Sequence, residues 1–235
     1  MKTRLQITTL ARIVVIATAS VLNVKAADHE APAALEFSSV VWGTLSLSEL
    51  YYPMGETFVP LDISLRKRSK IQALEKSEFF ELYLRKESTA GEVSYELVGQ
   101  TALVPNAKRL LFFIEEGDEA AELPLQLRAF NDSLEVFPAG TFRMCNDTSE
   151  TLQLVLNGVT IELKAGAVEL IKTGVSKDGG FLPFSILDSV GNPVMETRVL
   201  CQAGERKMII IHPPLKSQGS LVVNFLTEFI PTPSR

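Results

Sequence analysis

Two stretches of this chain carry the same kinds of anchor residue in the same order. One covers Gly55–Ile114 and the other covers Gly166–Ile211. Each contains a Ser-Lys pair, an aromatic-x-aliphatic pattern (Phe80–Leu82 and Phe184–Ile186), a glycine-containing turn, and a basic pair followed by an apolar run. A series of anchors that recurs in order is the signature of an internal repeat. The sequence therefore predicts that one β unit is duplicated within the chain.

The spacing and composition of the apolar segments predict strands. Strand-like segments recur at intervals of about ten residues, which is typical of sandwiches and barrels. The runs Leu110–Ile114 and Met208–Ile211 are apolar throughout, so we expect them to be buried on both faces near the middle of a sheet. Asn157-Gly158 lies between two alternating runs and predicts a type I′ hairpin turn. We therefore predict an all-β fold of two tandem β-sandwich units, Ig-like or jelly-roll-like.

The acidic, glycine-containing segment 115–124 has the composition of a linker between these units. We expect the first unit to cover residues 35–114 and the second to cover residues 125–231. Short tails are expected at 27–34 and 232–235. The alternative for 115–124 is a charged hairpin loop inside one continuous domain.

One segment, 69–86, is ambiguous between helix and strand. Ser69 would cap a helix whose apolar residues lie loosely on one side. The matching segment of the second stretch contains two glycines and Pro183, which interrupt a helix. We therefore favour a strand at Phe80–Leu84, with at most a short helical turn at 71–75.

Residues 1–26 have the features of a secretory signal peptide. A basic start precedes the apolar stretch Ile13–Leu22, and Val24 and Ala26 place small residues at the positions required for cleavage. The stretch is shorter than the roughly 20 residues that span a bilayer, although an uncleaved anchor is the alternative. We expect an exported protein, periplasmic or extracellular, that does not span a membrane after cleavage.

The charge balance restricts the class of partner. Removing residues 1–26 takes four of the 23 basic residues and none of the 28 acidic ones, so the net charge moves from −5 to −9. Clustered positive charge is needed to bind phosphate backbones, so nucleic acid is disfavoured. The expected partner is a protein or a polysaccharide of the cell envelope. The residues point to no cofactor.

Both cysteines, Cys145 and Cys201, lie in strand-like runs of the second unit. An exported pair of cysteines usually forms a disulfide, and a bridge between two sheets suits a sandwich. We therefore expect a Cys145–Cys201 disulfide. The alternative is that both are buried free thiols that pack as small hydrophobes.

Cleavage after Ala26 would create a specific metal-binding motif. The new start Ala27-Asp28-His29 would offer an amine, two amides and an imidazole, a square-planar set that suits Cu²⁺ or Ni²⁺. Cleavage one residue later would remove this arrangement, because the histidine would then stand at the second position.

Aromatic residues near position 50 are the first candidate for ligand binding. Tyr51 and Tyr52 form an aromatic turn shortly after Trp42, the only tryptophan, and exposed tyrosines stack on sugar faces. The alternative is that Trp42 fills the core and the tyrosines cover a sheet edge.

A basic cluster is the second candidate. Arg66, Lys67 and Arg68 form the only such cluster of an acidic chain, which would suit an anionic glycan or an acidic partner. The alternative is a solvated loop, or edge-strand charge that blocks aggregation.

Catalysis is disfavoured by the scarcity of histidine. His29 lies in the expected tail, and His212 follows an apolar run with no nucleophile-elbow motif nearby. We therefore expect a non-enzymatic exported protein that binds a partner or takes part in envelope assembly. The first alternative is a carbohydrate-binding module that uses Trp42, Tyr51 and Tyr52. The second is a glycosidase-type hydrolase with paired carboxylates, whose separation a sequence does not reveal.

Overall fold

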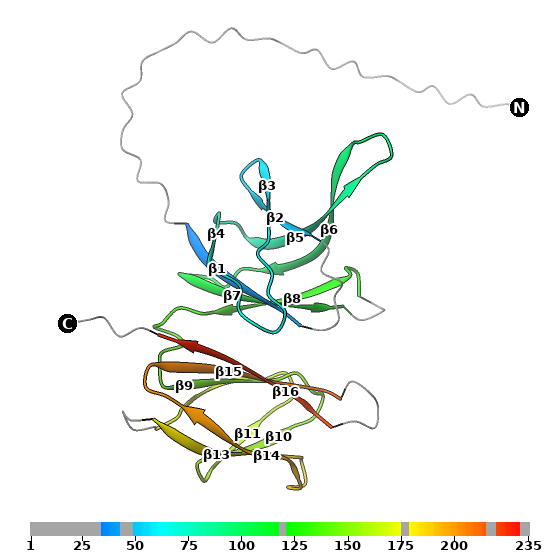
Figure 1. Ribbon diagram of the computed structural model, residues 1–235. Coiled ribbons are helices and arrows are strands. Elements are labelled where there is room, and N and C mark those ends of the chain that lie inside the picture. Colours follow the sequence, from blue (N-terminus) through cyan, green and yellow to red (C-terminus); the bar gives the residue numbers. More distant parts are fainter. Residues whose placement is uncertain (1–33, 43–48, 118–120, 175–178, 215–219, 231–235) are drawn as a thin grey trace, which may run out of the picture. The chain divides into compact units, whose positions relative to one another are not determined.

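The computed structural model describes residues 34–42, 49–117, 121–174, 179–214 and 220–230 (Figure 1). Within these residues the chain forms sixteen strands and no helix. The expected signal peptide, the Ala27-Asp28-His29 motif, the C-terminal tail and all but one residue of the 27–34 tail lie outside them.

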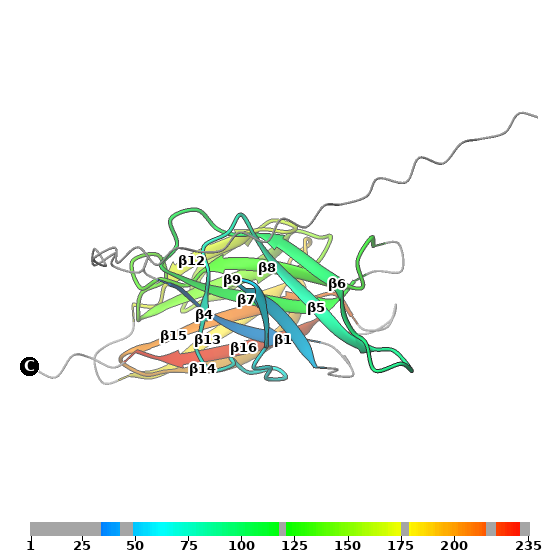
Figure 2. The same ribbon diagram turned by 90° about the horizontal axis from the view of Figure 1, so that it is seen from above.

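The strands belong to four sheets of four strands each, A to D. Sheet A has the order β4-β1-β7-β8 and sheet B the order β3-β2-β5-β6, and together they form the first sandwich. Its strands are β1 (Leu35–Val41), β2 (Leu50–Met54), β3 (Thr57–Pro60), β4 (Gln72–Leu74), β5 (Phe79–Glu87), β6 (Val93–Ala102), β7 (Arg109–Glu116) and β8 (Leu125–Asn131). Figure 2 shows β5 and β6 of sheet B crossing above β7 and β8 of sheet A.

Sheets C and D form the second sandwich, with the orders β12-β9-β15-β16 and β11-β10-β13-β14. Its strands are β9 (Thr141–Asn146), β10 (Leu152–Leu156), β11 (Val159–Leu163), β12 (Val168–Lys172), β13 (Gly180–Leu187), β14 (Pro193–Cys201), β15 (Glu205–His212) and β16 (Val222–Phe229).

The two sandwiches have the same topology, because adding eight to each strand number of the first gives the strand orders of the second. In each, one pair of strands is parallel (β1 with β7, β9 with β15) and the other pairs within the sheets are antiparallel. The pairing register even shifts at equivalent places, after Leu82 in β5 and after Ile186 in β13. The predicted all-β fold of tandem sandwiches is confirmed, and the repeated topology supports an internal duplication.

Only part of the anchor alignment proposed from the sequence is correct. Phe80–Leu82 and Phe184–Ile186 are equivalent, since both precede the register shift. Gly55, however, lies in the β2–β3 turn, whose counterpart is Asn157-Gly158, whereas Gly166 lies between β11 and β12. Glycine occurs at most turns of a β protein, so the order of glycines alone does not fix the alignment.

Residues 115–124 do not join the two sandwiches. β7 and β8 pair antiparallel with Glu116 opposite Leu125, so this segment connects neighbouring strands of sheet A, as the hairpin alternative states. The first sandwich therefore extends to Asn131, and the chain passes to the second through residues 132–140. Acidic residues and glycine suit a hairpin loop as well as a linker, which explains the wrong boundary.

The second half of the ambiguous segment 69–86 forms a strand, as expected. β5 contains Phe80–Leu84, as the glycines and proline of the second stretch indicated. The short helical turn expected at 71–75 is instead strand β4, which pairs antiparallel with β1 through Leu35 and Leu74.

The buried apolar residues that the structure describes form three clusters. One lies between sheets A and B, and one lies between sheets C and D. The third combines residues of sheets A and C, so the two sandwiches pack against each other inside one compact unit, residues 34–235. β7 and β15 contribute to a sandwich core and to this junction at alternate positions, which confirms that both apolar runs are buried on two faces.

The expected disulfide is wrong, and the alternative of two buried free thiols holds. Met144 packs in the second core, so its neighbour Cys145 points the other way, into the junction cluster. Cys201 lies in the second core, on β14 of sheet D. Burial raises the pKa of the Cys145 thiol to about 12 and also raises the pKa of Cys201, so both stay protonated.

Candidate functional site

Two equivalent strands line the junction between the sandwiches. β7 contains Arg109 and Glu115, and β15 contains Arg206 and His212 at the same spacing. Because alternate residues of a strand share a face, each strand presents an arginine, two apolar residues and a final polar residue. The apolar residues are Leu111, Phe113, Met208 and Ile210. The junction therefore has an apolar middle with a polar cluster at each end.

Arginines and two acids form the first polar cluster. Asp132 and Arg206 are both 0 % exposed, and the Arg206 guanidinium donates to Asp132 Oδ2 at 2.8 Å and to Glu228 Oε2 at 2.5 Å. Arg68 donates to Asp132 Oδ2 at 2.7 Å, and Arg109 donates to Glu228 Oε1 at 2.6 Å. Burial opposes ionisation of Glu228, but these arginines lower its pKa below the ordinary value. Each acid pairs with more than one arginine, and the arginines come from both sandwiches, so the cluster has a structural role.

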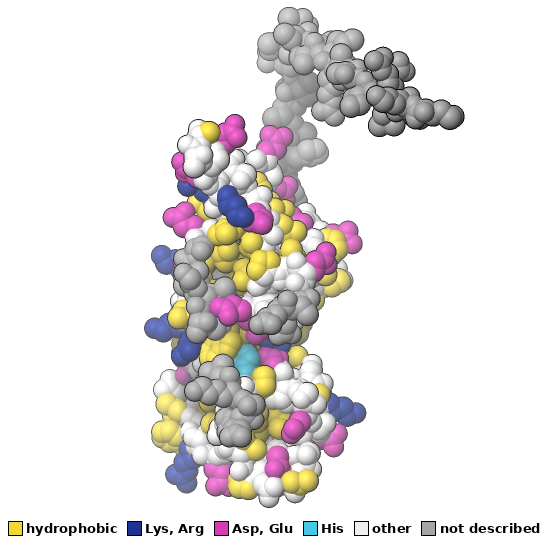
Figure 3. Space-filling model, turned by 90° about the vertical axis from the view of Figure 1, so that its right-hand side faces the viewer, with side chains coloured by type: hydrophobic (Ala, Val, Ile, Leu, Met, Phe, Trp, Pro, Cys, Tyr) yellow, Lys and Arg dark blue, Asp and Glu magenta, His cyan; other side chains and the backbone are white. Residues whose placement is uncertain are grey.

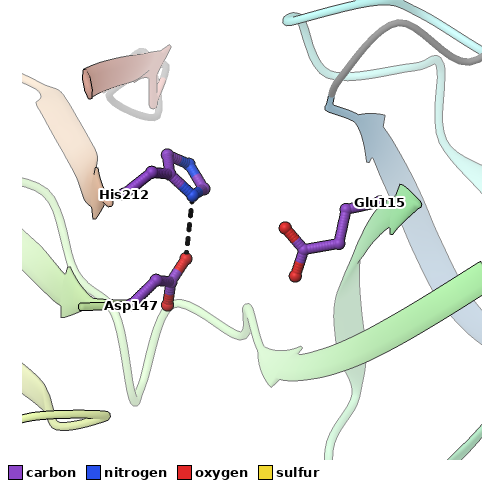
Figure 4. A group of neighbouring side chains, drawn as sticks. All are labelled: Glu115, Asp147 and His212. Atoms are coloured by element: carbon purple, nitrogen blue, oxygen red, sulfur yellow. Dashed lines mark ion pairs between the residues drawn. The ribbon is translucent and has the colours of Figure 1, made fainter. Parts of the chain in front are cut away.

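Glu115, Asp147 and His212 form the second polar cluster, shown in Figure 4. Each offers a ligand atom within 4.8 Å of the others, and His212 Nδ1 lies 3.2 Å from Asp147 Oδ2. Carboxylates with an imidazole are a donor set that Zn²⁺ accepts. Arg128 of β8, however, binds both carboxylate oxygens of Asp147 and lies 3.3 Å from Glu115 Oε1. A guanidinium already supplies the positive charge, so the geometry favours an ion-pair cluster over a metal centre.

Aromatic rings surround His212 at this end of the junction. Its ring stacks on Trp42, with centroids 5.0 Å apart and planes 2° apart, and lies 5.9 Å from the ring of Phe113. Burial lowers the pKa of His212 below its ordinary value; Asp147 opposes this effect and Arg128 adds to it. The imidazole is therefore neutral near pH 7. Trp42 is partly buried in this packing, with the guanidinium of Arg66 5.0 Å from its ring centroid.

A group of four rings lies on the outward side of sheet B, one from each of its strands. We call this group, Tyr51, Phe58, Tyr83 and Tyr95, the aromatic face. Phe58 and Tyr95 stack with centroids 4.0 Å apart and planes 11° apart. Tyr83 meets Phe58 edge-on at 4.9 Å, and Tyr51 meets Tyr95 edge-on at 5.4 Å. All four rings are half-buried, and Figure 3 shows hydrophobic side chains gathered on the first sandwich.

Carboxylates hold two hydroxyls of the aromatic face. Tyr51 donates to Glu49 Oε2 at 2.9 Å, and Tyr83 donates to Glu81 Oε2 at 2.8 Å. Burial and then Glu81 raise the pKa of Tyr83 to about 12, and the hydrogen bond to Glu49 raises the pKa of Tyr51. Both phenols remain neutral donors at physiological pH.

The structure separates the aromatic residues that the sequence grouped together. Tyr52 is 3 % exposed in the first core and donates to the carbonyl of Ala73 at 3.2 Å. Tyr51 points outward, because successive residues of β2 face opposite sides of the sheet. Trp42 lies at the junction, in agreement with the core alternative. The three residues of the basic cluster also have different surroundings. Arg66 packs on Trp42, Arg68 forms an ion pair with Asp132, and Lys67 is exposed.

Sequence reasoning missed Phe58, Tyr83 and Tyr95. The signal that could have found them is alternation: each occupies an outward position of its strand, where a two-layer sandwich usually places a polar residue. In β5, for example, Phe80 and Leu82 enter the core, so Tyr83 must share the outward side with Glu81.

Among the described residues of the second sandwich, the positions equivalent to the aromatic face carry no aromatic rings. The β2–β3 turn and the β10–β11 turn each contain two residues and are equivalent. Counted from these turns, Tyr51 corresponds to Gln153 and Phe58 corresponds to Thr160. The register shift matches Tyr83 with Leu187. Tyr95 has no counterpart, because the β13–β14 hairpin ends too early. The aromatic face is therefore a property of the first copy.

Comparison of the chain with family models and with curated proteins gives no match. Within the described residues, no helix is long and apolar enough to cross a membrane.

Proposed function

We propose that the protein is a non-enzymatic binding protein, exported to the periplasm or the extracellular space, that recognises a protein partner through the aromatic face. One observation supports this proposal above the others. Four half-buried rings occupy the outward side of sheet B, whereas the equivalent positions of sheet D carry Gln153, Thr160 and Leu187. Contiguous exposed apolar surface marks interaction sites, and tyrosine and phenylalanine are enriched in them.

The arrangement of the rings favours a protein over a carbohydrate. A sugar stacks on an open ring face. Phe58 and Tyr95 reach toward each other from the two edge strands of sheet B and cover one face of each ring. Tyr51 and Tyr83 contact that stacked pair edge-on, so the cluster packs within itself. A protein surface can pack against such ring edges, because apolar contact does not require a free face.

The apolar surface available to a partner extends beyond the four rings of the aromatic face. Phe79 (41 % exposed) and Val93 (46 % exposed) are exposed apolar residues. Phe79 precedes Tyr83 by four positions in β5, and Val93 precedes Tyr95 by two in β6, so both share the outward side. A partner that covers the aromatic face can thus also bury these two side chains.

Site-specific photo-crosslinking tests the proposal. The crosslinking amino acid p-benzoylphenylalanine replaces Phe79 or Val93, and in matched controls it replaces Phe181, which is 63 % exposed on β13 of the second sandwich. We expect a crosslinked partner of one mass from the first two positions and none from the control. Phe58→Thr, which copies the residue of the second sandwich, should abolish the product while circular dichroism confirms the fold.

Two results would contradict the proposal. Equal crosslinking from Phe181 would mean that capture is unspecific. Retention of the chain on an insoluble envelope polysaccharide that is lost in Phe58→Thr would assign the aromatic face to a carbohydrate, the alternative class of ligand.

A further inference from the structure

We infer that the segment of the partner that docks on the aromatic face is cationic and extended, with basic and apolar side chains alternating along the side that faces the rings. This inference rests on the proposed function and adds the chemistry of the partner. The evidence is the pair of carboxylates beside the rings. Glu49 and Glu81 each accept a tyrosine hydroxyl of the face.

Hydrogen bonds to both carboxylate oxygens hold Glu81 in place. Oε2 accepts the Tyr83 hydroxyl, and Oε1 accepts the side-chain amide of Gln100 at 3.1 Å. Both donors are neutral, so they fix the position of the carboxylate without cancelling its charge. Among the described residues, no ion pair joins Glu49 or Glu81 to a cation. A fixed carboxylate without a counter-ion favours a cationic group in a partner, since the entropy cost of ordering it is already met.

The other charges on the outward side of β5 largely cancel. Arg85 and Glu87 lie on the same side as Glu81 and pair with each other at 3.3 Å. Lys86, on the opposite side of the strand, is paired with Glu96. The surface around the rings therefore keeps the two negative charges of Glu49 and Glu81. This local balance has the same sign as the whole chain, whose net charge is −5.

The spacing of charges and rings sets the pattern of the partner. Glu49 precedes Tyr51 by two positions, and Glu81 precedes Tyr83 by two positions. Residues two apart in an extended chain lie about 7 Å apart on one side. Because neighbouring residues of an extended chain point to opposite sides, a partner segment that places an apolar side chain on the ring edges reaches a carboxylate with the side chain two positions away. The complementary sequence is one in which Lys or Arg alternates with Leu, Ile or Phe at every second position.

Two synthetic peptides test the inference on the whole protein. One is an eight-residue peptide, Leu-Ser-Lys-Ser-Leu-Ser-Lys-Ser, with an N-terminal fluorophore, and the other replaces every Lys with Glu. We expect fluorescence anisotropy to detect binding of the lysine peptide and none of the glutamate peptide. Glu49→Gln/Glu81→Gln should weaken binding about fivefold at low salt, and the difference should shrink as salt is added. Glu162→Gln, an exposed change on sheet D, is the matched control and should leave the affinity unchanged.

Equal affinity of the two peptides, or an affinity that the double variant leaves unchanged, would overturn the inference. The proposed function fails separately, because its readout is the crosslinked partner and its dependence on Phe58. A partner that is captured through Phe58 but is insensitive to the two glutamines would keep the function and remove the cationic segment. Loss of peptide binding in the control variant would show that the peptide binds elsewhere by charge alone.

Discussion

Sheets B and D occupy the same place in two copies of one framework, yet their outward sides differ. Their inward positions agree in character, since Tyr52 and Leu154 both enter a sandwich core. Outward, Phe58 corresponds to Thr160. The inward agreement is what folding requires of any sandwich. The outward difference has no such explanation, and it is the reason for proposing that the first copy binds a partner on this surface.

Hairpin length is the second difference between the copies. Both hairpins end in the same turn: the amides of Ser88 and Gly91 bond across it in the same pattern as those of Asp188 and Gly191. Gly91 and Gly191 have φ angles of 82° and 89°, which disfavour a side chain. Five residues of β5, Tyr83–Glu87, follow the register shift, but only Leu187 follows it in β13. The additional length carries Tyr95, which completes the aromatic face.

The largest expected effect compares the equivalent arginines of β7 and β15. Arg206→Met removes a fully buried guanidinium and leaves Asp132 with fewer partners, so the free energy of unfolding should fall by about 3–5 kcal/mol. Arg109→Met should cost roughly 1–2 kcal/mol, because Arg109 is partly exposed and Arg68 and Arg206 still pair with the acids. Urea unfolding measures both values. Equal losses would show that the two positions are not as different as their burial indicates.

The next largest effect is a difference in stability between substitutions on the outward sides of sheets B and D. Phe58→Thr removes a stacked ring and should lower the free energy of unfolding by about 1–2 kcal/mol. The reverse change, Thr160→Phe, adds an exposed ring to sheet D and should change stability by less than about 0.5 kcal/mol. It should also create no crosslinking from the second sandwich. If Thr160→Phe stabilises as much as Phe58→Thr destabilises, the two sides are interchangeable surfaces.

A smaller effect concerns the last polar position of the same strands, Glu115 in β7 and His212 in β15. The pKa of His212 is lowered by folding, so the unfolded chain binds its proton more readily than the folded chain does. Stability should therefore fall as the pH decreases from 6.5, the ordinary histidine value, through the lower folded pKa. His212→Gln should flatten this part of the profile in urea unfolding from about pH 7.5 to about pH 5. An unchanged slope would remove His212 as the group responsible.

The smallest expected effect is at Cys145, whose counterpart in the first copy is Val40. Both lie in the junction cluster. Cys145→Val should change stability by less than about 1.5 kcal/mol, because a buried free thiol packs as a small hydrophobe. Iodoacetamide should modify neither cysteine in the native protein and both after unfolding, as mass spectrometry can show. Detection of a disulfide-linked Cys145–Cys201 peptide would instead support the disulfide that the sequence predicts.

Local patterns predicted the fold because the framework depends on them. The Asn157-Gly158 turn has positive φ angles of 48° and 80°, as a type I′ hairpin requires, and residues 110–114 are buried as their unbroken apolar run indicated. The candidate site depended on relations that a sequence does not display. Tyr51 and Tyr52 are neighbours in the chain but lie on opposite sides of β2. Phe58 and Tyr95 stack although 37 positions separate them.

The partner of Arg68 and the state of the two cysteines also depend on relations between residues that are distant in the sequence. Arg68 follows Arg66 and Lys67 in the chain, but its partner Asp132 lies 64 positions away. Export and spacing predict a bridge between Cys145 and Cys201, but the alternation within β9 turns Cys145 toward the other sandwich. Each error replaced a three-dimensional relation with a distance along the chain.

Strand β7 packs with the first core on one side and with the second sandwich on the other, which has a consequence for communication across the molecule. Opening of the second sandwich would remove the junction packing of Leu111 and Phe113 in β7. We therefore expect the two copies to exchange their amide hydrogens through shared openings more than through separate ones. A partner bound at the aromatic face should slow exchange in β15, a strand that it never touches, because stabilising one state of a cooperative unit protects all of it.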